Sequence, residues 1–571
     1  MRILCLHVDY INFKPLKKAL KNVPELSEKE KEMKKVGESL VVLTAVEKGD
    51  VVKESVKKLV ESVKDIAKQI KVKTVVLYPY AHLSSALAPP ETAEKILKDA
   101  EKKLKKKFKV VRAPFGYYKE FELKVKGHPL SELSREFKSV GKEKLEKEKE
   151  ENISHLLNQL SRTKLDTSKL KENDHRILGQ TMDLFSFNEA APGQPFWHNN
   201  GLIIINELIS YWREMHRKAE YQEISTPFIL DNKLWKVSGH WGLYKENMFI
   251  TDYENRDFGV KPMNCPGAML VYRSKKRSYR ELPLRFAELG IVHRKELSGV
   301  LAGLLRVIKI TQDDAHIFVS EEQLQDEIIN VIRLFKELFD KFGFKYSFTI
   351  SIRSEEKKDK YLGGDRLWKA AEGALASGLK KLKLKYEIVK GEAKFYGPSL
   401  DVVIKDSLER EWQCATLQLD FNMPKRFELT YTGKDNKEHI PIVLHRVIYG
   451  SLERFIAILL EHTNGRLPTW LAPIQVRVLS FTDRNTEHAK KIVRQLGESI
   501  PNLRLDADFR SIPVSSKVKE SELMRIPWVI LIGDKEQEKN TLAIRNEGKV
   551  KYEFKINDFI KDLKELIEKR K

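Results

Sequence analysis

One stretch of the sequence, from residue 304 to residue 319, carries several polar side chains that can do chemistry. It reads LLRVIKITQDDAHIFV. If this stretch is a β-strand, alternate side chains point to the same face. A structural strand more often alternates apolar with solvated residues, so polar side chains in line on one face indicate a cavity wall, although a solvated face remains the alternative. The residues on this face are Arg306, Ile310, Gln312, Asp314 and His316.

Further arginines and an acid lie close to this stretch along the chain. Upstream, FAELGIVHRKEL places Arg294 and Glu296 on a common strand face, and the glycine-punctuated segment SGVLAGL follows. Downstream, PIVLHRVIYGSLERFIAILLE begins extended and becomes an amphipathic helix, with Arg454 in its first turn. Two strands and a loop thus carry two arginines and an acid, and the helix adds a third arginine.

The three cysteines are isolated from one another. Cys5, Cys265 and Cys414 are an odd number without a C-x-x-C pair, which argues against a disulfide framework and favours a reducing, cytoplasmic setting. Cys265 lies between two prolines in KPMNCPGAML. A solitary cysteine is more often a small buried apolar residue than a ligand, and we keep that interpretation for Cys5 and Cys414.

These segments need a large scaffold, and 571 residues predict three or four domains. Residues 1–137 alternate short β-like runs with helix-period stretches, which predicts a small α/β domain. Residues 138–173 begin with a run of charged residues and predict a helical linker. Residues 174–471 mix strands with helices, including a long helix over 201–220, and residues 472–571 predict a compact α/β domain. The fold class is therefore multidomain, α/β and α+β.

The composition points to a polyanionic partner. Lysine and arginine exceed the acids by 22 and the isoelectric point is near 9.4, so nucleic acid is the obvious candidate. A lysine-rich surface that serves solubility or heat tolerance is the alternative. Apolar runs are shorter than the roughly 18 residues that span a bilayer, and the first residues do not form a signal-peptide core. We expect no membrane partner and a cytoplasmic protein.

Eight motifs in a fixed order carry a resemblance to a known family. The chain resembles the class II aminoacyl-tRNA synthetases, and among them the threonyl-tRNA synthetases of the archaeal type. The resemblance implies an antiparallel-sheet catalytic core, and the class I signatures are absent. The motifs are AEYQEISTPFI, KPMNCPG, FAELGIVHRKE, TQDDAHIF, FYGP, WQCATLQLDF, LHR and GSLERF.

The resemblance implies a catalytic zinc ion, one per chain. Cys265, His316 and His445 match the zinc ligands of the family, although 51 and 129 residues separate them in sequence. Three protein ligands leave a fourth position open, and a site that must ligate a hydroxyl group disfavours valine relative to threonine. The residues expected to line the threonine site are Met263, Gln312, Asp314, Tyr396, Gln418 and Ser451.

The same resemblance implies an ATP site with Mg²⁺ bridging the phosphates. Arg294 matches the residue at the α-phosphate, Glu296 the one at the adenine amino group, and Arg306 with Arg454 those at the outer phosphates. Two positions depart from the family: Ile310 replaces a phenylalanine that covers adenine, and Ser399 replaces a lysine of many bacterial members. The expected ATP-binding residues are Arg294, Glu296, Arg306, Ile310, Gln413, Thr416 and Arg454.

The N-terminal domain resembles the archaeal editing domain, which shares its fold with D-aminoacyl-tRNA deacylases. Serine carries the hydroxyl group and lacks only a methyl, which gives a first site about 1–3 kcal/mol of discrimination. A second site that removes serine from threonine tRNA is therefore expected. The family match implies that Lys119 orients the ester, while His82, Tyr118 and Glu132 shape the pocket; Val8 departs from the serine expected in its motif.

The C-terminal domain resembles the anticodon-binding domain of class IIa synthetases. The match implies that Arg525, Glu536 and Arg545 read anticodon bases and that Arg510 and Lys517 hold the tRNA backbone, with Ser511 as a departure from the bacterial asparagine. Class IIa members pair through their first motif, so a homodimer is expected around residues 201–227.

The function expected from the sequence is a threonine–tRNA ligase that uses ATP, threonine and threonine tRNA and edits serine errors. Two alternatives remain. The first is a tRNA-binding deacylase or scaffold with an inactive ligase core, which the departure at Ile310 favours. The second is a plain nucleic-acid-binding protein, which would bind any RNA in a salt-sensitive way and show no preference for threonine tRNA.

Overall fold

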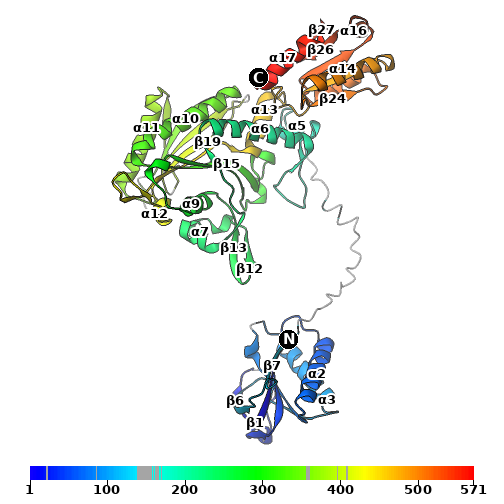
Figure 1. The fold of residues 1–571 in the computed structure, drawn as a ribbon, viewed down its shortest axis with the longest axis vertical. Helices are drawn as coiled ribbons and strands as arrows, with labels where there is room; N and C mark the ends of the chain where they lie inside the picture. Colours follow the sequence, from blue (N-terminus) through cyan, green and yellow to red (C-terminus); the bar gives the residue numbers. More distant parts are fainter. Residues whose placement is uncertain are drawn as a thin grey trace. The chain divides into compact units, whose positions relative to one another are not determined.

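The computed structural model describes the chain as two compact units, residues 1–156 and 157–571 (Figure 1). The linker predicted for 138–173 falls largely outside the described residues. Among the described residues, no helix is long and apolar enough to cross a membrane. The residues described are 1–20, 23–84, 86–137, 157, 160, 166–168, 170–354, 356, 361–394, 396–406 and 409–571.

The first unit is built on one seven-stranded sheet around a long central strand. The strand order is β2-β1-β3-β4-β5, and β6 and β7 also pair with β1. Helices α2 and α3 cover the sheet because their apolar residues recur at helical spacing and join one core cluster with β3 and β4. The elements are β1 (Arg2–Lys18), α1 (Glu28–Lys31), β2 (Lys34–Val36), β3 (Ser39–Ala45), α2 (Val52–Gln69), β4 (Thr74–Pro79), α3 (Pro90–Leu104), β5 (Lys109–Arg112), β6 (Tyr117–Val125) and β7 (Glu132–Glu136).

The second unit contains the antiparallel sheet that the resemblance implies. Eight strands run in the order β10-β14-β15-β22-β19-β18-β16-β17, and every pair is antiparallel except the two at the edges. The strands are β10 (Gln222–Glu223), β14 (Leu284–His293), β15 (Lys309–Val319), β16 (Lys345–Ile352), β17 (Tyr386–Lys390), β18 (Ser399–Lys405), β19 (Glu411–Asp420) and β22 (Ile442–Ser451).

Helices cover one face of this sheet and leave the other to the cavity. Ala315, Ile317 and Val319 of β15 join an apolar cluster with α10 and α11, and Figure 1 shows these helices against the sheet. Because strand side chains alternate, the intervening residues of β15 face the opposite side. The main helices are α5 (His175–Thr181), α6 (Asn199–Lys218), α7 (Asn232–Ser238), α8 (His240–Leu243), α9 (Cys265–Arg273), α10 (Leu324–Lys341), α11 (Asp365–Lys381), α12 (Met423–Arg426) and α13 (Leu452–Thr463).

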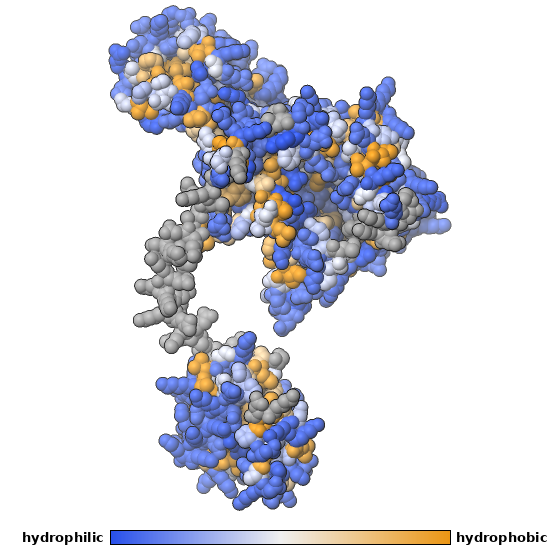
Figure 2. All heavy atoms as spheres, turned by 180° about the vertical axis from the view of Figure 1, so that it is seen from behind, coloured by the Kyte–Doolittle hydropathy of each residue, from blue (hydrophilic) through white to orange (hydrophobic). Residues whose placement is uncertain are grey.

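Short strands complete the second unit. A three-stranded sheet has the order β11-β13-β12, and β8 with β9 and β20 with β21 form two-stranded sheets. These strands are β8 (Phe185–Ser186), β9 (Phe196–Trp197), β11 (Ile229–Asp231), β12 (Ile250–Tyr253), β13 (Arg256–Val260), β20 (Tyr431–Thr432) and β21 (Glu438–His439). Figure 2 shows hydrophilic residues over most of the visible surface.

The predicted C-terminal α/β domain is a five-stranded sheet within the second unit. The order is β24-β23-β25-β26-β27, with β23 parallel to β24 and β25. Arg504 ties this domain to the helix α6 through an ion pair with Glu207 at 2.6 Å. Its elements are β23 (Val476–Ser480), α14 (Thr486–Ser499), β24 (Leu505–Asp508), α15 (Val514–Leu523), β25 (Trp528–Ile532), α16 (Asp534–Lys539), β26 (Leu542–Asn546), β27 (Lys549–Phe554) and α17 (Ile556–Glu568).

Two predicted elements differ in their bounds. The stretch from residue 304 to 319 is a strand only from Lys309, because Gly303–Leu305 forms a 3-10 turn and Gly303 has a φ of +53°. Arg306 therefore does not lie on the strand with Gln312, as alternation had predicted. The long helix predicted over 201–220 runs from Asn199 to Lys218.

Candidate active site

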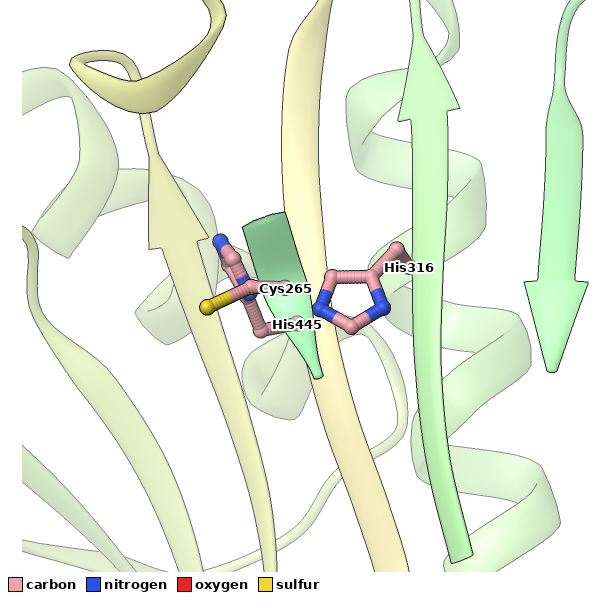
Figure 3. A group of neighbouring side chains, drawn as sticks. All are labelled: Cys265, His316 and His445. Carbon is pink, nitrogen blue, oxygen red and sulfur yellow. The ribbon is translucent and has the colours of Figure 1, made fainter. Parts of the chain in front are cut away.

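Strand register brings two of the predicted metal ligands together. His316 on β15 lies directly opposite His445 on β22, and directly opposite residues point to the same face of a sheet. Their ring centroids are 4.8 Å apart. Cys265 arrives from a different direction, at the first turn of α9. Figure 3 shows that the three side chains project into the same space from separate elements.

These three side chains form a donor set that fits a zinc ion. The ligand atoms of Cys265, His316 and His445 lie within 4.8 Å of one another, and all three residues are buried. One sulfur and two imidazole nitrogens are typical zinc ligands, and three of them leave a fourth position open. The spacing of these residues along the sequence could not reveal the grouping, since the members come from α9, β15 and β22.

The buried Asp420 orients one ligand of this set. His445 donates from Nε2 to Oδ2 of Asp420 at 2.9 Å, so its Nδ1 is the nitrogen left for a metal. Burial, followed by the carboxylates of Asp314 and Asp420, raises the pKa of the Cys265 thiol well above its ordinary value. Burial similarly lowers the pKa of His316 well below its ordinary value. A cation would reverse the effect on the thiol, because it stabilises the thiolate.

One cavity of about 620 Å³ contains every residue predicted for the catalytic core. Its size lies within the usual range for a small-molecule site. The sixteen predicted residues in its wall are Met263, Cys265, Arg294, Glu296, Arg306, Ile310, Gln312, Asp314, His316, Tyr396, Gln413, Thr416, Gln418, His445, Ser451 and Arg454.

Polar side chains near the three ligands form a connected end of the cavity. Asn264 donates to Oδ2 of Asp314 at 3.1 Å and to Oε1 of Gln312 at 3.4 Å. Tyr396 donates its hydroxyl hydrogen to Gln418. Burial raises the pKa of Asp314, although the hydrogen bond from Asn264 opposes that effect. A ligand with a cationic amino group would favour the charged carboxylate here.

Three arginines, Arg294, Arg306 and Arg454, also line the cavity. Arg306 pairs with Glu296 at 2.9 Å, and Arg294 donates to the carbonyl oxygen of Pro262 at 3.3 Å. Burial and then the neighbouring guanidinium groups lower the pKa of Arg454, which nevertheless stays a cation. Because like charges converge here, an anionic ligand would be stabilised.

The two departures in the core have different surroundings. Ile310 lines the cavity. Ser399 lies beneath it, 1% exposed, and donates to Oδ2 of Asp401 at 3.0 Å. Asp401 also accepts hydrogen bonds from the predicted ATP residues Gln413 at 2.6 Å and Thr416 at 2.8 Å. Ser399 is therefore part of the support of the cavity wall.

Two residues of the site were not singled out from the sequence. Asp420 holds His445, and Asn264 holds Asp314. Each lies within a quoted motif, WQCATLQLDF or KPMNCPG. Their place within these motifs was therefore the only signal, and only the packed structure shows which neighbour each side chain reaches.

Three family models match successive parts of the chain. Residues 1–137 match the archaea-specific editing domain of threonyl-tRNA synthetase, and residues 247–463 match the class II core domain of tRNA synthetases (G, H, P, S and T). Residues 475–566 match the anticodon binding domain. The order of the three matches is the order of the three predicted domains.

A solved structure decides the family. The crystal structure of the RNA binding domain of threonyl-tRNA synthetase from Cryptosporidium parvum Iowa II is 37% identical in sequence, with a TM-score of 0.65. The similarity covers 69% of this chain and 98% of that one. The chain belongs to the threonyl-tRNA synthetase family.

Bacterial relatives agree with this assignment. The threonine–tRNA ligases of Carboxydothermus hydrogenoformans and Caldanaerobacter subterraneus subsp. tengcongensis are 49% and 51% identical over 378 and 376 residues. Each match covers 66% of this chain and 59% or 58% of the relative. The chain therefore spans less than two thirds of the length of either relative in the match.

The residues predicted for editing fall into separate groups of contacts. Lys119 on β6 donates to the carbonyl oxygens of Pro114 at 3.0 Å and Tyr117 at 2.7 Å, and its ammonium group lies 5.2 Å from the centre of the Tyr78 ring. Burial lowers its pKa to about 8. Tyr118, the next residue along the strand, points to the opposite face and is 55% exposed.

The other two editing residues lie elsewhere on the same unit. His82 is exposed, and its ring lies 5.4 Å from that of Tyr80. Glu132 pairs with Leu6 of β1, whereas Lys119 pairs with Pro15 of the same strand. Nine residues of strand correspond to about 30 Å when extended. Within one chain, the prediction that Glu132 shares a pocket with Lys119 therefore finds no support.

Val8, the departure in the N-terminal motif, is fully buried. It belongs to an apolar cluster that also contains Phe13, Val41 and Tyr78. Tyr78 is the ring beside the Lys119 ammonium group. The departure therefore changes the core under this lysine.

The predicted anticodon residues are mostly engaged in local pairs. Lys517 is 1% exposed and donates to the carbonyl oxygen of Ser480 at 2.9 Å. A backbone-holding role would require its ammonium group at the surface, so the structure contradicts that prediction, because the lysine secures α15 to β23. Arg510 pairs with Asp508 at 2.6 Å and is 55% exposed.

The remaining anticodon candidates also have partners. Arg545 pairs with Glu522 at 2.7 Å, and Glu536 accepts a hydrogen bond from the backbone nitrogen of Gly533 at 3.1 Å. Arg525 donates to the side chain of Asn464 at 3.4 Å. Ser511, the departure, donates to Asp483 at 3.2 Å.

Proposed function

We propose that the chain is a threonine–tRNA ligase that activates threonine with ATP, transfers it to threonine tRNA and hydrolyses mischarged seryl-tRNA at its N-terminal domain. One observation carries the proposal. A single cavity is lined by a cysteine, two histidines and three arginines. This arrangement suits a small amino acid joined to a phosphate.

The three metal ligands and their neighbours suit threonine. Cys265, His316 and His445 would hold one Zn²⁺ per chain, and the bound ion would supply a Lewis-acid position for the amino and hydroxyl groups of threonine, which valine cannot fill. Asp314 would accept a hydrogen bond from the threonine amino group, with Asn264 fixing its carboxylate. The other residues proposed to surround the substrate are Met263, Gln312, Tyr396, Gln418 and Ser451.

The three arginines suit ATP with Mg²⁺. A carboxylate oxygen of threonine attacks the α-phosphorus, the bond to the β-phosphate oxygen breaks, and pyrophosphate leaves with the electron pair. Arg294 would neutralise charge at the α-phosphate, and Arg306 and Arg454 at the leaving phosphates. The protein contributes position and charge. The adenine would lie against Ile310 and Glu296, with Gln413 and Thr416 in the adjacent wall.

The N-terminal domain suits a second sieve. Its match to the archaea-specific editing domain supports hydrolysis of the seryl ester. We propose that the Lys119 ammonium group stabilises the charge that develops on the ester oxygen when water attacks. Because burial brings its pKa to about 8, this lysine is mostly charged at neutral pH.

The whole chain suits a tRNA partner. A net charge of +22 attracts the polyanion, and residues 475–566 match an anticodon binding domain. We propose a cytoplasmic homodimer that pairs around the segment 201–227 and contains one zinc ion per chain. The exposed Leu202 within this segment and the exposed Phe228 directly after it support an interface there.

Threonine-dependent exchange of pyrophosphate into ATP, measured together with zinc content, tests the ligase proposal. We expect exchange with threonine, much weaker exchange with serine and none with valine. Zinc-loaded protein without any exchange would leave the alternative of a tRNA-binding scaffold with an inactive core. Binding of threonine tRNA and unrelated RNA with equal affinity would favour the plain nucleic-acid-binding alternative.

A further inference from the structure

A buried polar cluster lies near the arginines of the cavity. His175, the first residue of α5, is 1% exposed, and Glu461 near the end of α13 is 2% exposed. His175 Nδ1 lies 2.6 Å from Oε1 of Glu461, and Arg410 pairs with the second oxygen of Glu461. None of these residues lines the cavity. Their effect on the site must therefore pass through other residues.

Both ring nitrogens of His175 are used by the protein. The backbone nitrogen of Leu304 donates to Nε2 at 3.0 Å. Since Nε2 accepts a hydrogen bond, the ring hydrogen lies on Nδ1 and is donated to Glu461. Asp174, His175 and Glu461 lie close enough to suggest a metal site, but with both nitrogens engaged in this way the ring offers no free lone pair to an ion.

Glu461 is charged and holds the ring in this tautomer. Burial alone would raise its pKa, but hydrogen bonds from His175 and Arg410 outweigh burial, so the pKa lies below its ordinary value. The carboxylate is therefore ionised at neutral pH and accepts only. The imidazole is left with one acceptor, which faces the backbone of Leu304.

The peptide held by His175 belongs to the turn that precedes Arg306. Gly303 has a φ of +53°, and a Cβ atom there would come within 2.3 Å of His175 Nε2. The next carbonyl oxygen, that of Leu305, accepts a hydrogen bond from Nε of Arg454 at 3.0 Å. The imidazole of His175 thus fixes the turn Gly303–Leu305 through the backbone nitrogen of Leu304. Arg454, which lines the cavity, fixes the same turn through the carbonyl oxygen of Leu305.

We propose that His175 is a positioning residue for the ATP phosphates, in that it fixes the turn that carries Arg306 and supports Arg454. The proposal deepens the ligase function and rests on it. The two arginines come from separate segments, since Arg306 directly follows the turn and Arg454 lies in α13, and the His175–Glu461 pair connects the turn with α13. Loss of the contact to Leu304 would let both guanidinium groups shift, and shifts of about 1 Å cost rate or affinity heavily.

Two conservative variants separate the two hydrogen bonds of the ring. In His175→Gln, an amide oxygen can take the place of Nε2 and accept from Leu304. In His175→Asn, an amide nitrogen can take the place of Nδ1 and donate to Glu461, while the acceptor for Leu304 is lost. We expect His175→Asn and His175→Ala to raise the KM for ATP in pyrophosphate exchange by about 10-fold, and His175→Gln to stay within about threefold of the wild type.

Leu178→Ala is the control for stability. Leu178 is buried on the same helix, α5, so this variant lowers the melting temperature without removing the contact to Leu304, and its KM for ATP should stay unchanged. Gly303→Ala is a second probe that leaves His175 intact. Its added methyl group would push the turn away from the imidazole, and we expect the KM for ATP to rise here too.

The outcomes separate this inference from the ligase proposal. Wild-type protein without threonine-dependent exchange would overturn the ligase proposal. Active wild-type protein in which the asparagine and glutamine variants share an unchanged KM for ATP would overturn the role of His175 alone. A rise in KM that merely follows the loss in melting temperature, as judged against Leu178→Ala, would do the same.

Discussion

The chain contains two candidate catalytic regions that are built in opposite ways. The cavity of the second unit collects side chains from β15, β19, β22, α9, α13 and the segment that follows β14, and encloses them. The region around Lys119 depends on one strand and its neighbouring rings, and Tyr118, Phe121 and His82 remain exposed. The first suits a pair of small substrates enclosed on many sides. The second suits one end of a large substrate, whose own surface would cover the part of the site that the protein leaves open.

This difference predicts which substitutions should impair each region. In the enclosed cavity, each functional group has a supporting residue, such as Asp420 for His445 or Asn264 for Asp314. Substitutions at some distance from the substrates should therefore lower the activity. Around Lys119, support comes mainly from two backbone carbonyl oxygens. Most of the sensitivity should then be concentrated in the lysine itself.

The largest effect should come from removing a metal ligand. His445→Ala takes one imidazole from the set of three, and we expect loss of zinc and a decrease in threonine-dependent pyrophosphate exchange of about 10³-fold, since a Lewis acid contributes several kcal/mol. Metal analysis and the exchange assay check this result. Hydrolysis of seryl-tRNA should persist, and a variant that keeps both zinc and exchange would refute the ligand assignment.

Removing a charge from the first unit should have the converse effect: it should impair editing and leave threonine activation unchanged. Lys119→Ala should slow the hydrolysis of seryl-tRNA by about 10²-fold, as expected when one group that stabilises developing charge is lost. Exchange with threonine should not change. Deacylation of purified seryl-tRNA measures the effect, with Lys124→Ala on the same strand as the matched control. Clearance at the wild-type rate would remove Lys119 from the mechanism.

Support residues should have smaller effects in the cavity. Asp420→Asn keeps the shape but weakens the acceptor for His445, and we expect zinc affinity and exchange to fall by about 10-fold to 100-fold. Competition with a chelator measures the affinity. If Asp420→Asn binds zinc like the wild type, the support of His445 by this carboxylate is not functional, and the contrast between the two regions weakens.

The smallest effect should come from pH. The ammonium form of Lys119 predominates below its pKa of about 8, so hydrolysis that needs the charge should be half-maximal near pH 8 and about 10-fold reduced near pH 9. The same titration acts on stability in the opposite direction: a rise in pH lowers the editing rate but raises the free energy of unfolding. Because the folded-state pKa is lowered, burying the charge costs stability at neutral pH, and this cost diminishes as pH rises from 8 towards 10.5.

The pH profile distinguishes the two regions when both activities are measured in the same buffers. The arginines of the cavity keep their charge over this range, so the exchange reaction should not share a decline centred near pH 8. A common decline in both activities would indicate a general loss of structure, and an editing rate that is flat up to pH 10 would contradict the role of the lysine charge.

The fold was largely predictable because alternation and helical spacing are local. The three-domain order followed from where strand-like runs and charged runs change, and the family matches follow the same order. The predictions that were wrong also concern local structure. The 3-10 turn at Gly303–Leu305 delays the start of the strand to Lys309, and Lys517, which looked like a surface cation, turns inward to a backbone carbonyl. Amino-acid composition predicts neither the start of this strand nor the buried position of Lys517.

The sequence by itself determined the kinds of chemical group present and the order in which the motifs occur, because these are properties of the linear chain. Only the tertiary structure decided which groups meet. His316 and His445 are opposite each other because β15 and β22 pair in one register, and a shift of one residue would send one imidazole to the other face. His175 had no signal at all in the sequence, since its role depends on a backbone nitrogen 129 residues away.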